Sequence, residues 1–252
     1  MTITLVQSNI IWEDKIANIA KAESLIPSNQ MSDLILFPEM SFTGFSMNID
    51  LTKELKKETC LIMKDIAKRY GKSLGFGWVK DCGEKCENHY SIIDSDGNTI
   101  ADYAKMHPFS YYGEDKYFLG GNDIKIFEFK TIPFSAFICY DLRFPELFRE
   151  VANKVHAVII PACWPAKRAE HWKALLRARA IENQIYVFAV NCVGNVGGLD
   201  YSGDSCVIDP DGKVIEMLSD KEGVITYEFE DDVEKYRALF PVLKDRRLDI
   251  YG

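Results

Sequence analysis

The sequence predicts an α/β protein built as a four-layer α-β-β-α sandwich, in which two mixed β-sheets pack face to face and helices cover both outer sides. Three observations lead to this fold. Short β-rich runs alternate with helical segments along all 252 residues, without an internal repeat or a linker-like stretch. Two hairpin patterns interrupt the alternation, so the sheets must contain antiparallel pairs as well as parallel ones. The predicted helices form two pairs separated by strands, one pair for each sheet.

The first half of the chain provides one pair of helices, predicted at 14–26 and 51–70 from the helical spacing of apolar residues. Gly71 directly follows the second of them and is a suitable C-cap. The strand at 34–37 is a continuous apolar run, which is typical of a strand buried on both faces. Including this run, we expect strands at 3–7, 34–37, 74–79, 90–93 and 99–104, the last two joined by turn residues as a hairpin.

The second half repeats the pattern with helices at 145–152 and 167–183. A turn of the sequence Pro-Asp-Gly at 210–212 predicts the second hairpin. Segment 240–252 carries a few apolar residues without a strand pattern, and we expect it to form a C-terminal tail outside the sandwich. The strands expected in this half are 134–138, 155–160, 186–190, 206–209, 214–218 and 224–229.

Composition excludes several classes of partner. Thirty Lys and Arg residues against 38 Asp and Glu residues give a net charge of −8, which argues against binding to nucleic acid or to an anionic membrane. No apolar run reaches the length of a transmembrane helix, and the first ten residues lack the features of a signal peptide. The seven cysteines are scattered and odd in number, as expected for free thiols in a reducing cytoplasm.

Three residue types suited to catalysis follow predicted strands, where active sites of α/β proteins lie. Glu39 follows the strand at 34–37, Lys105 follows the strand at 99–104, and Cys139 follows the strand at 134–138 just before a helix. Backbone N–H groups at such a strand–turn–helix elbow can lower a thiol pKa and bind an oxyanion. Each residue alone is more simply explained as packing or surface. Together they provide a nucleophile, a base and a cation, which is the set needed for acyl transfer through a thioester.

Other clusters allow other interpretations. Cys82, Cys86 and His89 have a metal-like spacing but lack a clear fourth ligand, so a structural zinc site is the less favoured alternative. His107 or His156 could pair with Cys139 as in a cysteine protease, although core roles are commoner for such histidines.

The helix at 167–183 carries several basic residues. A solvated or salt-bridged helix face explains most of them, and one arginine could bind an anionic substrate.

The motifs around these residues resemble the nitrilase superfamily of carbon–nitrogen hydrolases. The resemblance covers 33–40, 105–109 and 139–146, and it continues through 177–183 and 203–212 in the same order and spacing. It implies that 1–252 is a single carbon–nitrogen hydrolase domain. The superfamily's Glu–Lys–Cys triad falls on Glu39, Lys105 and Cys139, and its second carboxylate falls on Glu114.

Segments 43–48, 163–165 and 201–205 are similar to the omega-amidase branch, whose members hydrolyse the terminal amide of small 2-oxo acid monoamides. The resemblance implies a homodimer and requires neither a metal nor an organic cofactor. It places Phe45, Tyr140 and Trp164 around the substrate, and Pro108 departs from the branch pattern. The alternatives are another superfamily activity (nitrilase, N-carbamoyl amino-acid hydrolase or deaminated-glutathione amidase) and a non-catalytic binding relative.

The expected chemistry needs no further group. Glu39 takes the proton of Cys139, and the sulfur attacks the amide carbon. Lys105 and the backbone N–H of Tyr140 stabilise the oxyanion, and Glu114 holds Lys105 and the amide in place.

Overall fold

The computed structural model of the protein describes residues 1–29 and 31–251. Its first sheet has the strand order β14-β1-β2-β3-β4-β5, with the short β6 beside β4. The three central strands β1, β2 and β3 are parallel, and the remaining pairs of the main order are antiparallel. The strands of this sheet are β1 (Thr2–Gln7), β2 (Leu34–Leu36), β3 (Ser73–Asp81), β4 (Cys86–Ile93), β5 (Thr99–Ala104), β6 (Phe118–Leu119) and β14 (Gly223–Glu228).

The second sheet has the order β11-β12-β10-β9-β8-β7, with β13 beside β12. Its central strands β8, β9 and β10 are parallel, and hairpins extend it on both sides. Both sheets are therefore mixed, as predicted. The strands of this sheet are β7 (Ile126–Phe129), β8 (Ile132–Ala136), β9 (Ala157–Ala162), β10 (Tyr186–Asn191), β11 (Val193–Val196), β12 (Leu199–Ile208) and β13 (Val214–Ser219).

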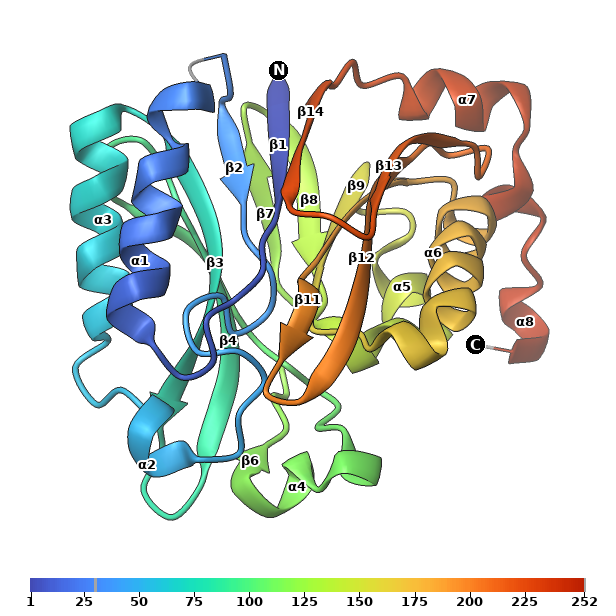
Figure 1. Cartoon of the computed structure of the whole chain (residues 1–252). Helices are drawn as coiled ribbons and strands as arrows, with labels where there is room; N and C mark the ends of the chain where they lie inside the picture. Colours follow the sequence, from blue (N-terminus) through green and yellow to red (C-terminus); the bar gives the residue numbers. More distant parts are fainter. Residues whose placement is uncertain (30, 252) are drawn as a thin grey trace.

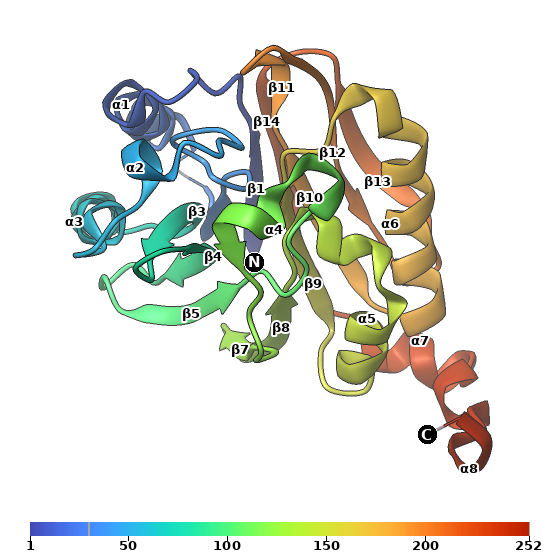
Figure 2. The ribbon, with the colours of Figure 1, turned by 90° about the horizontal axis from the view of Figure 1, so that it is seen from below.

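Helices cover the outer face of each sheet, which confirms the four-layer sandwich (Figures 1 and 2). Helices α1 (Lys15–Leu25) and α3 (Glu58–Tyr70) cover the first sheet, and α5 (Pro145–Val151) and α6 (Ala169–Asn183) cover the second. The space between the sheets is the main core, where side chains of β1, β2 and β4 meet those of β8, β9 and β10. The carboxyl ends of the parallel strands in each sheet lie at one edge, and the loops there build the site described below.

The predicted helix at 51–70 is wrong in its first third. A short helix α2 (Ile49–Thr52) ends at Lys53, whose backbone is extended (φ −68°, ψ 149°). Glu54 then forms a bridge to Lys80 on β3, and its buried carboxylate accepts a hydrogen bond from the Thr59 N–H at 2.9 Å. These contacts with β3 interrupt the helix, and an apolar pattern carries no information about them.

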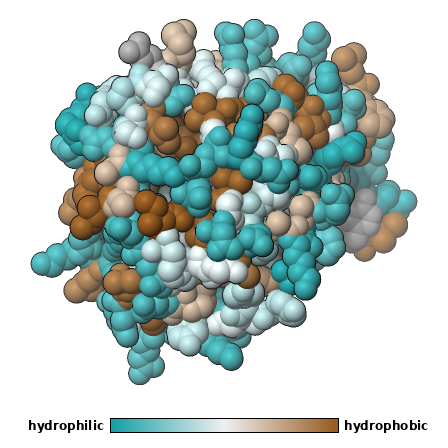
Figure 3. Space-filling view, viewed as in Figure 1, coloured by the Kyte–Doolittle hydropathy of each residue, from teal (hydrophilic) through white to brown (hydrophobic). Residues whose placement is uncertain are grey.

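The apolar residues whose spacing suggested this helix are only partly buried. Leu55 and Leu61 are 76% and 61% exposed, whereas Ile66 is buried and packs α3 against the sheet together with Cys60 and Met63. Apolar side chains consequently remain on the surface of the face shown in Figure 3. The end of α3 agrees with the prediction, because Gly71 (φ 61°) caps it in the left-handed conformation.

The chain after β14 lies outside the sandwich beyond α6. It forms α7 (Val233–Leu239) and, after a 3-10 turn, the short α8 (Leu248–Tyr251), which projects from the molecule in Figure 2. The sequence pattern predicted neither helix. Within residues 1–29 and 31–251, no helix is long and apolar enough to cross a lipid bilayer.

Candidate active site

Glu39 lies just beyond β2 and is completely buried. One carboxylate oxygen, Oε1, accepts hydrogen bonds from Lys105 Nζ at 2.9 Å and from Asn88 Nδ2 at 2.8 Å. The other, Oε2, accepts a hydrogen bond from the backbone N–H of Cys163, which follows β9 of the second sheet, at 2.8 Å. The carboxylate is thus held by donors from both sheets, which fixes its orientation.

Lys105 and Glu114 complete a buried charge cluster with Glu39. Lys105 follows β5 and is 1% exposed, and its Nζ contacts both oxygens of Glu114 at 3.1 and 2.9 Å. Glu114 begins the short helix α4 (Glu114–Tyr117) and also accepts a hydrogen bond from the Phe109 N–H. The two carboxylates raise the pKa of Lys105 well above its ordinary value and outweigh burial, which acts to lower it. Lys105 is therefore a fixed cation at neutral pH.

Cys139 stands at the start of the 3-10 helix that follows β8, with a positive φ of 50°. The turn is held by the buried carboxylate of Asp141, which accepts hydrogen bonds from the Ile138 N–H (3.1 Å), the His107 N–H (2.9 Å) and the Tyr103 hydroxyl (2.8 Å). These hydrogen bonds hold the backbone around the Cys139 sulfur in its strained conformation.

Burial raises the pKa of the Cys139 thiol well above its ordinary value, the negative charge of Glu39 raises it further, and Lys105 opposes this only in part. Backbone N–H groups at the elbow, which can lower a thiol pKa, do not offset the burial of this side chain. A thiol with a raised pKa needs a base before it can act as a nucleophile, which is the role expected of Glu39.

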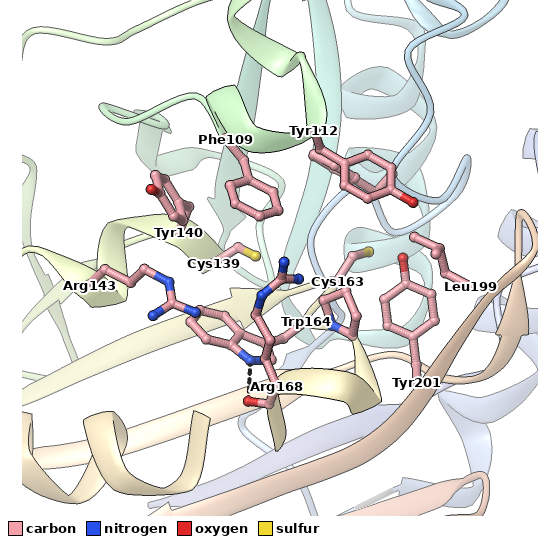
Figure 4. A pocket seen from close by; sticks show the side chains of 12 residues that line it. Phe109, Tyr112, Cys139, Tyr140, Arg143, Cys163, Trp164, Arg168, Leu199 and Tyr201 are labelled. Carbon is pink, nitrogen blue, oxygen red and sulfur yellow. Dashed lines mark hydrogen bonds between the residues drawn. The ribbon is translucent and has the colours of Figure 1, made fainter. Parts of the chain in front are cut away.

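A pocket of about 390 Å³, partly open to solvent, leads to Cys139 (Figure 4). Phe45, Tyr140 and Trp164, which the sequence singled out, line it together with the nucleophile. The Lys105 ammonium lies 5.1 Å from the centre of the Phe45 ring, which connects this wall to the charge cluster. The remaining lining residues are Phe109, Tyr112, Arg143, Cys163, Pro165, Arg168, Leu199 and Tyr201.

Two arginines on the pocket wall have no carboxylate partner within the described residues. Arg143 lies over the Trp164 ring at 4.7 Å, and Arg168 lies over the Phe109 ring at 5.6 Å. Burial lowers the pKa of Arg143, and the positive charge of Arg168 lowers it further. Two cations that repel each other beside a thiol favour an anion between or beside them.

Trp164 is positioned by a buried amide from the neighbouring strand. Asn191 Oδ1 accepts the Trp164 N–H at 2.8 Å, and Asn191 Nδ2 donates to the Trp164 carbonyl at 3.0 Å. This pair of bonds fixes the loop after β9, which supplies both Trp164 and the Cys163 N–H that holds Glu39.

Asn88 and Arg143 were not predicted as site residues, and Arg168 was predicted only as part of a basic helix. Asn88 is a single polar residue on the inward face of β4, between the apolar positions Cys86 and Tyr90, and this interruption was its available signal. Arg143 belongs to the nucleophile motif, where its charge without a nearby acid was the signal.

The alternative clusters do not come together as sites. Cys82 is exposed at the turn after β3, whereas Cys86 and His89 lie on opposite faces of β4 because they are three residues apart. No group of three or more metal-ligating side chains occurs among the described residues. His107 bonds to Asp141 and His156 pairs with Asp231, so both rings are engaged away from the thiol.

With this geometry established, comparison with known proteins gives the family. A model of the carbon–nitrogen hydrolase family matches residues 2–238. The chain belongs to the carbon–nitrogen hydrolase family. It is therefore a hydrolase that acts on non-peptide carbon–nitrogen bonds in linear amides.

Similar proteins cover nearly the whole chain. A 2-oxoglutaramate amidase from Bacillus subtilis (strain 168) is 35% identical over 99% of both chains, and an omega-amidase from Yersinia enterocolitica is 33% identical over 97% of this chain and 96% of its own.

Solved structures share the architecture. A carbon–nitrogen hydrolase superfamily protein from Xanthomonas campestris, with an arsenic adduct in its active site, superimposes with a TM-score of 0.92 at 32% identity, covering 98% of this chain and 97% of its own. A mutant amidase from Nesterenkonia sp. AN1, with acrylamide added at the active-site cysteine, gives a TM-score of 0.88 at 25% identity over 100% and 98% of the two chains.

Proposed function

We propose that this hydrolase cleaves the terminal amide of small 2-oxo acid monoamides through a thioester on Cys139, releasing ammonia and a 2-oxo dicarboxylate. The observation that carries the proposal is the pair of arginines, without a carboxylate partner among the described residues, on the wall of the pocket that ends at Cys139. They suit a substrate that bears a carboxylate at one end and an amide at the other. Similarity to proteins named 2-oxoglutaramate amidase and omega-amidase supports the same substrate class.

Acylation begins when Glu39 accepts the thiol proton as Cys139 sulfur attacks the amide carbon. The carbonyl oxygen becomes an oxyanion, which Lys105 and the backbone N–H of Tyr140 stabilise. Protonated Glu39 then gives its proton to the amide nitrogen. The carbon–nitrogen bond breaks, ammonia leaves, and the acyl group stays on the sulfur as a thioester.

Deacylation repeats these steps with water. Glu39, again a carboxylate, accepts a proton from a water that attacks the thioester carbon, and the same donors stabilise the second oxyanion. The carbon–sulfur bond breaks, and Glu39 returns the proton to the sulfur as the acid departs. Glu114 takes no proton in this scheme. It keeps Lys105 charged and in place through two contacts of 3.1 and 2.9 Å.

Arg143 is assigned to the substrate carboxylate. Its guanidinium is fixed over Trp164 at 4.7 Å and is one turn from the nucleophile, so it can hold the far end of a short acid while the amide lies at Cys139. Arg168, whose guanidinium lies 5.0 Å from the Tyr111 ring, adds a second positive charge on the pocket wall. Neither arginine has to break an ion pair with a carboxylate of the described residues before it binds an anion, which lowers the free-energy cost of binding.

A panel of substrates scored by ammonia release tests the function. We expect turnover of 2-oxosuccinamate and 2-oxoglutaramate, much weaker turnover of propionamide and butyramide, and none in Cys139→Ala. Equal rates on neutral and anionic amides would contradict the assigned carboxylate. Preference for a nitrile or an N-carbamoyl amino acid would instead assign one of the other superfamily activities, and inactivity on the whole panel would favour a binding relative.

We also propose that the enzyme works in the cytoplasm as a homodimer. All seven cysteines are free thiols, which supports a reducing compartment. Helices α5 and α6 offer little apolar surface for a dimer contact, since Ile181, at 48%, is the one large apolar side chain that these two helices expose. The C-terminal segment supports the dimer, because its Phe240, Leu248 and Ile250 are 59%, 55% and 67% exposed.

A further inference from the structure

Asn88 donates to both buried carboxylates of the site. Its Nδ2 lies 2.8 Å from Glu39 Oε1 and 3.2 Å from Glu114 Oε1. Lys105 Nζ donates to the same two oxygens, at 2.9 and 3.1 Å. Two donors thus serve one pair of acceptor atoms, and only one of the donors carries a charge.

The amide of Asn88 can face only one way. Asn88 is 1% exposed in the middle of β4, and its backbone carbonyl accepts the Lys105 N–H at 2.8 Å, so its position is fixed by the sheet. A reversed amide would place its oxygen against two carboxylate oxygens. In the observed orientation Oδ1 has no hydrogen-bond partner among the described residues. A buried acceptor is left unpaired so that both donors of the amide can be used.

We propose that Asn88 is a positioning residue that keeps both carboxylates ionised and orients Glu39 as the proton acceptor for Cys139. The proposal rests on the proposed role of Glu39 as the base. Hydrogen bonds donated to a carboxylate favour its charged form. A neutral donor does this without a second cation, which would neutralise the pair and weaken Glu39 as a base.

The sign of the effect follows from the groups around Glu39. Lys105 at the end of β5 favours the carboxylate form, whereas Glu114 of α4 opposes it by its like charge. The thiols of Cys139 and Cys163 and the phenol of Tyr201 face the same space, and burial raises the pKa of all three. Burial also raises the pKa of Glu114. Removing the Asn88 donors takes away a hydrogen bond that favours the charged form of this buried pair, so activity that depends on the pair should move to higher pH.

The test is the pH dependence of Cys139 alkylation by iodoacetamide, followed by mass spectrometry of the intact protein and its peptides. We expect the acidic limb of the rate profile to move up by about one pH unit in Asn88→Ala and Asn88→Ser, because a hydrogen bond to a charged group is typically worth this much. In Asn88→Asp it should move further, since a third carboxylate adds like charge. The acidic limb of kcat/KM for 2-oxosuccinamate should move with it.

Asn183→Asp is the matched control. Asn183 is also fully buried with an unpartnered Oδ1, but it lies at the end of α6, and its Nδ2 donates to a helix carbonyl. This variant should lower the stability of the protein but leave the acidic limb of the alkylation rate profile at the same pH as in the wild type. Folded Asn88 variants that are uniformly slower with an unshifted limb would overturn the proposal. Failure of all three Asn88 variants to fold would overturn it too, because Asn88 would then serve the fold.

Alkylation needs no turnover of a 2-oxo acid monoamide, so an error in the proposed substrate leaves this experiment readable. The role of Glu39 is checked separately. Glu39→Gln should abolish the acidic limb of the rate profile. If the limb persists in that variant, Glu39 is not the base. That result differs from the unshifted limb in Asn88 variants, which would overturn the role of Asn88.

Discussion

At the scale of single residues, the site is a balance of buried charges. Glu39, Lys105 and Glu114 are 0%, 1% and 0% exposed, so none of them recovers hydration energy from solvent. Lys105 stabilises both carboxylates, and breaking a buried ion pair by removing one partner typically costs about 3–5 kcal/mol. Truncating variants would therefore mix catalysis with stability. Isosteric variants that keep the shape and change the chemistry give a cleaner comparison.

The two carboxylates should separate when the acyl-enzyme is trapped. Glu39→Gln cannot accept the thiol proton, so we expect both half-reactions to stop. Glu114→Gln keeps a base but loosens Lys105, so turnover should fall while some thioester still forms. Either change can lower the rate by roughly 10²–10⁴-fold, and the rate alone does not distinguish them. Acid quenching and intact-protein mass spectrometry should find acyl-enzyme in Glu114→Gln only. Wild-type acylation in Glu39→Gln would reject Glu39 as the first base.

Arg143 should act on binding of the anionic substrate. Arg143→Ala removes a charged donor that has no other carboxylate partner in the described structure, so we expect KM for 2-oxosuccinamate to rise roughly 10- to 100-fold. For neutral butyramide the change should be small. Steady-state kinetics on both substrates checks this, with Arg168→Ala measured in parallel. An equal loss on both amides would mean that Arg143 supports the pocket wall and does not bind the carboxylate.

At the scale of elements, β3 supports the loop that carries Glu39. A Cβ atom added to Gly77 on β3 would lie 2.3 Å from the Met40 backbone nitrogen and 2.9 Å from the Glu39 carbonyl carbon. The close approach is held by a hydrogen bond from the Gly77 N–H to Ser41 Oγ at 2.8 Å. Only glycine permits this close approach, so β3 packs directly against the backbone of the loop that carries Glu39.

Gly77→Ala should therefore displace Glu39 without touching a catalytic side chain. Backbone atoms cannot yield locally, and a shift of about 1 Å at a catalytic group can cost roughly 10²-fold in rate. We expect such a loss in kcat together with a lower melting temperature. Gly223→Ala in β14 is the control, since its Cβ would meet only the end of the Leu218 side chain, at 3.0 Å. Near wild-type kinetics in Gly77→Ala would show that the loop adapts.

The elements also show what the sequence can and cannot predict. Glu39 and Cys139 could be located because each directly follows an apolar run, and strand ends are where α/β sites form. The hydrogen bonds of Glu39 with Asn88 and with Cys163 could not be predicted, since they depend on how the loop after β2 packs against β4 and against the second sheet. The same reason explains the incorrect helix at 51–70, where Glu54 is held by β3. Burial, which sets the pKa of Cys139, is a property of the assembled sandwich and of no single segment.

At the scale of the whole molecule, the C-terminal segment leaves large apolar side chains exposed to solvent. Residues 240–251 lie beyond α6 (Figure 2). Two large apolar side chains of this segment, Ile250 and Phe240, are 67% and 59% exposed, whereas apolar side chains of this size in the core are buried. Gln184 ties the start of this segment to the end of α6, because its Nε2 donates to the Phe240 carbonyl at 2.6 Å. A segment that is anchored at one end and exposes apolar side chains along its length suits a contact with a second copy of the chain, which would share a two-fold axis.

The proposed homodimer can therefore be tested by mutation of this segment alone. We expect light scattering at micromolar concentration to give twice the mass of the chain, and Leu248→Asp with Ile250→Asp to shift the mass toward the monomer, because burying two new carboxylates in an apolar contact is costly. Leu55→Asp is the control: it places the same charge at a side chain that is 76% exposed beside α3, so the dimer should persist. A wild-type protein that is monomeric in this range would reject the dimer. A double variant that remains dimeric would place the two-fold contact elsewhere on the molecule.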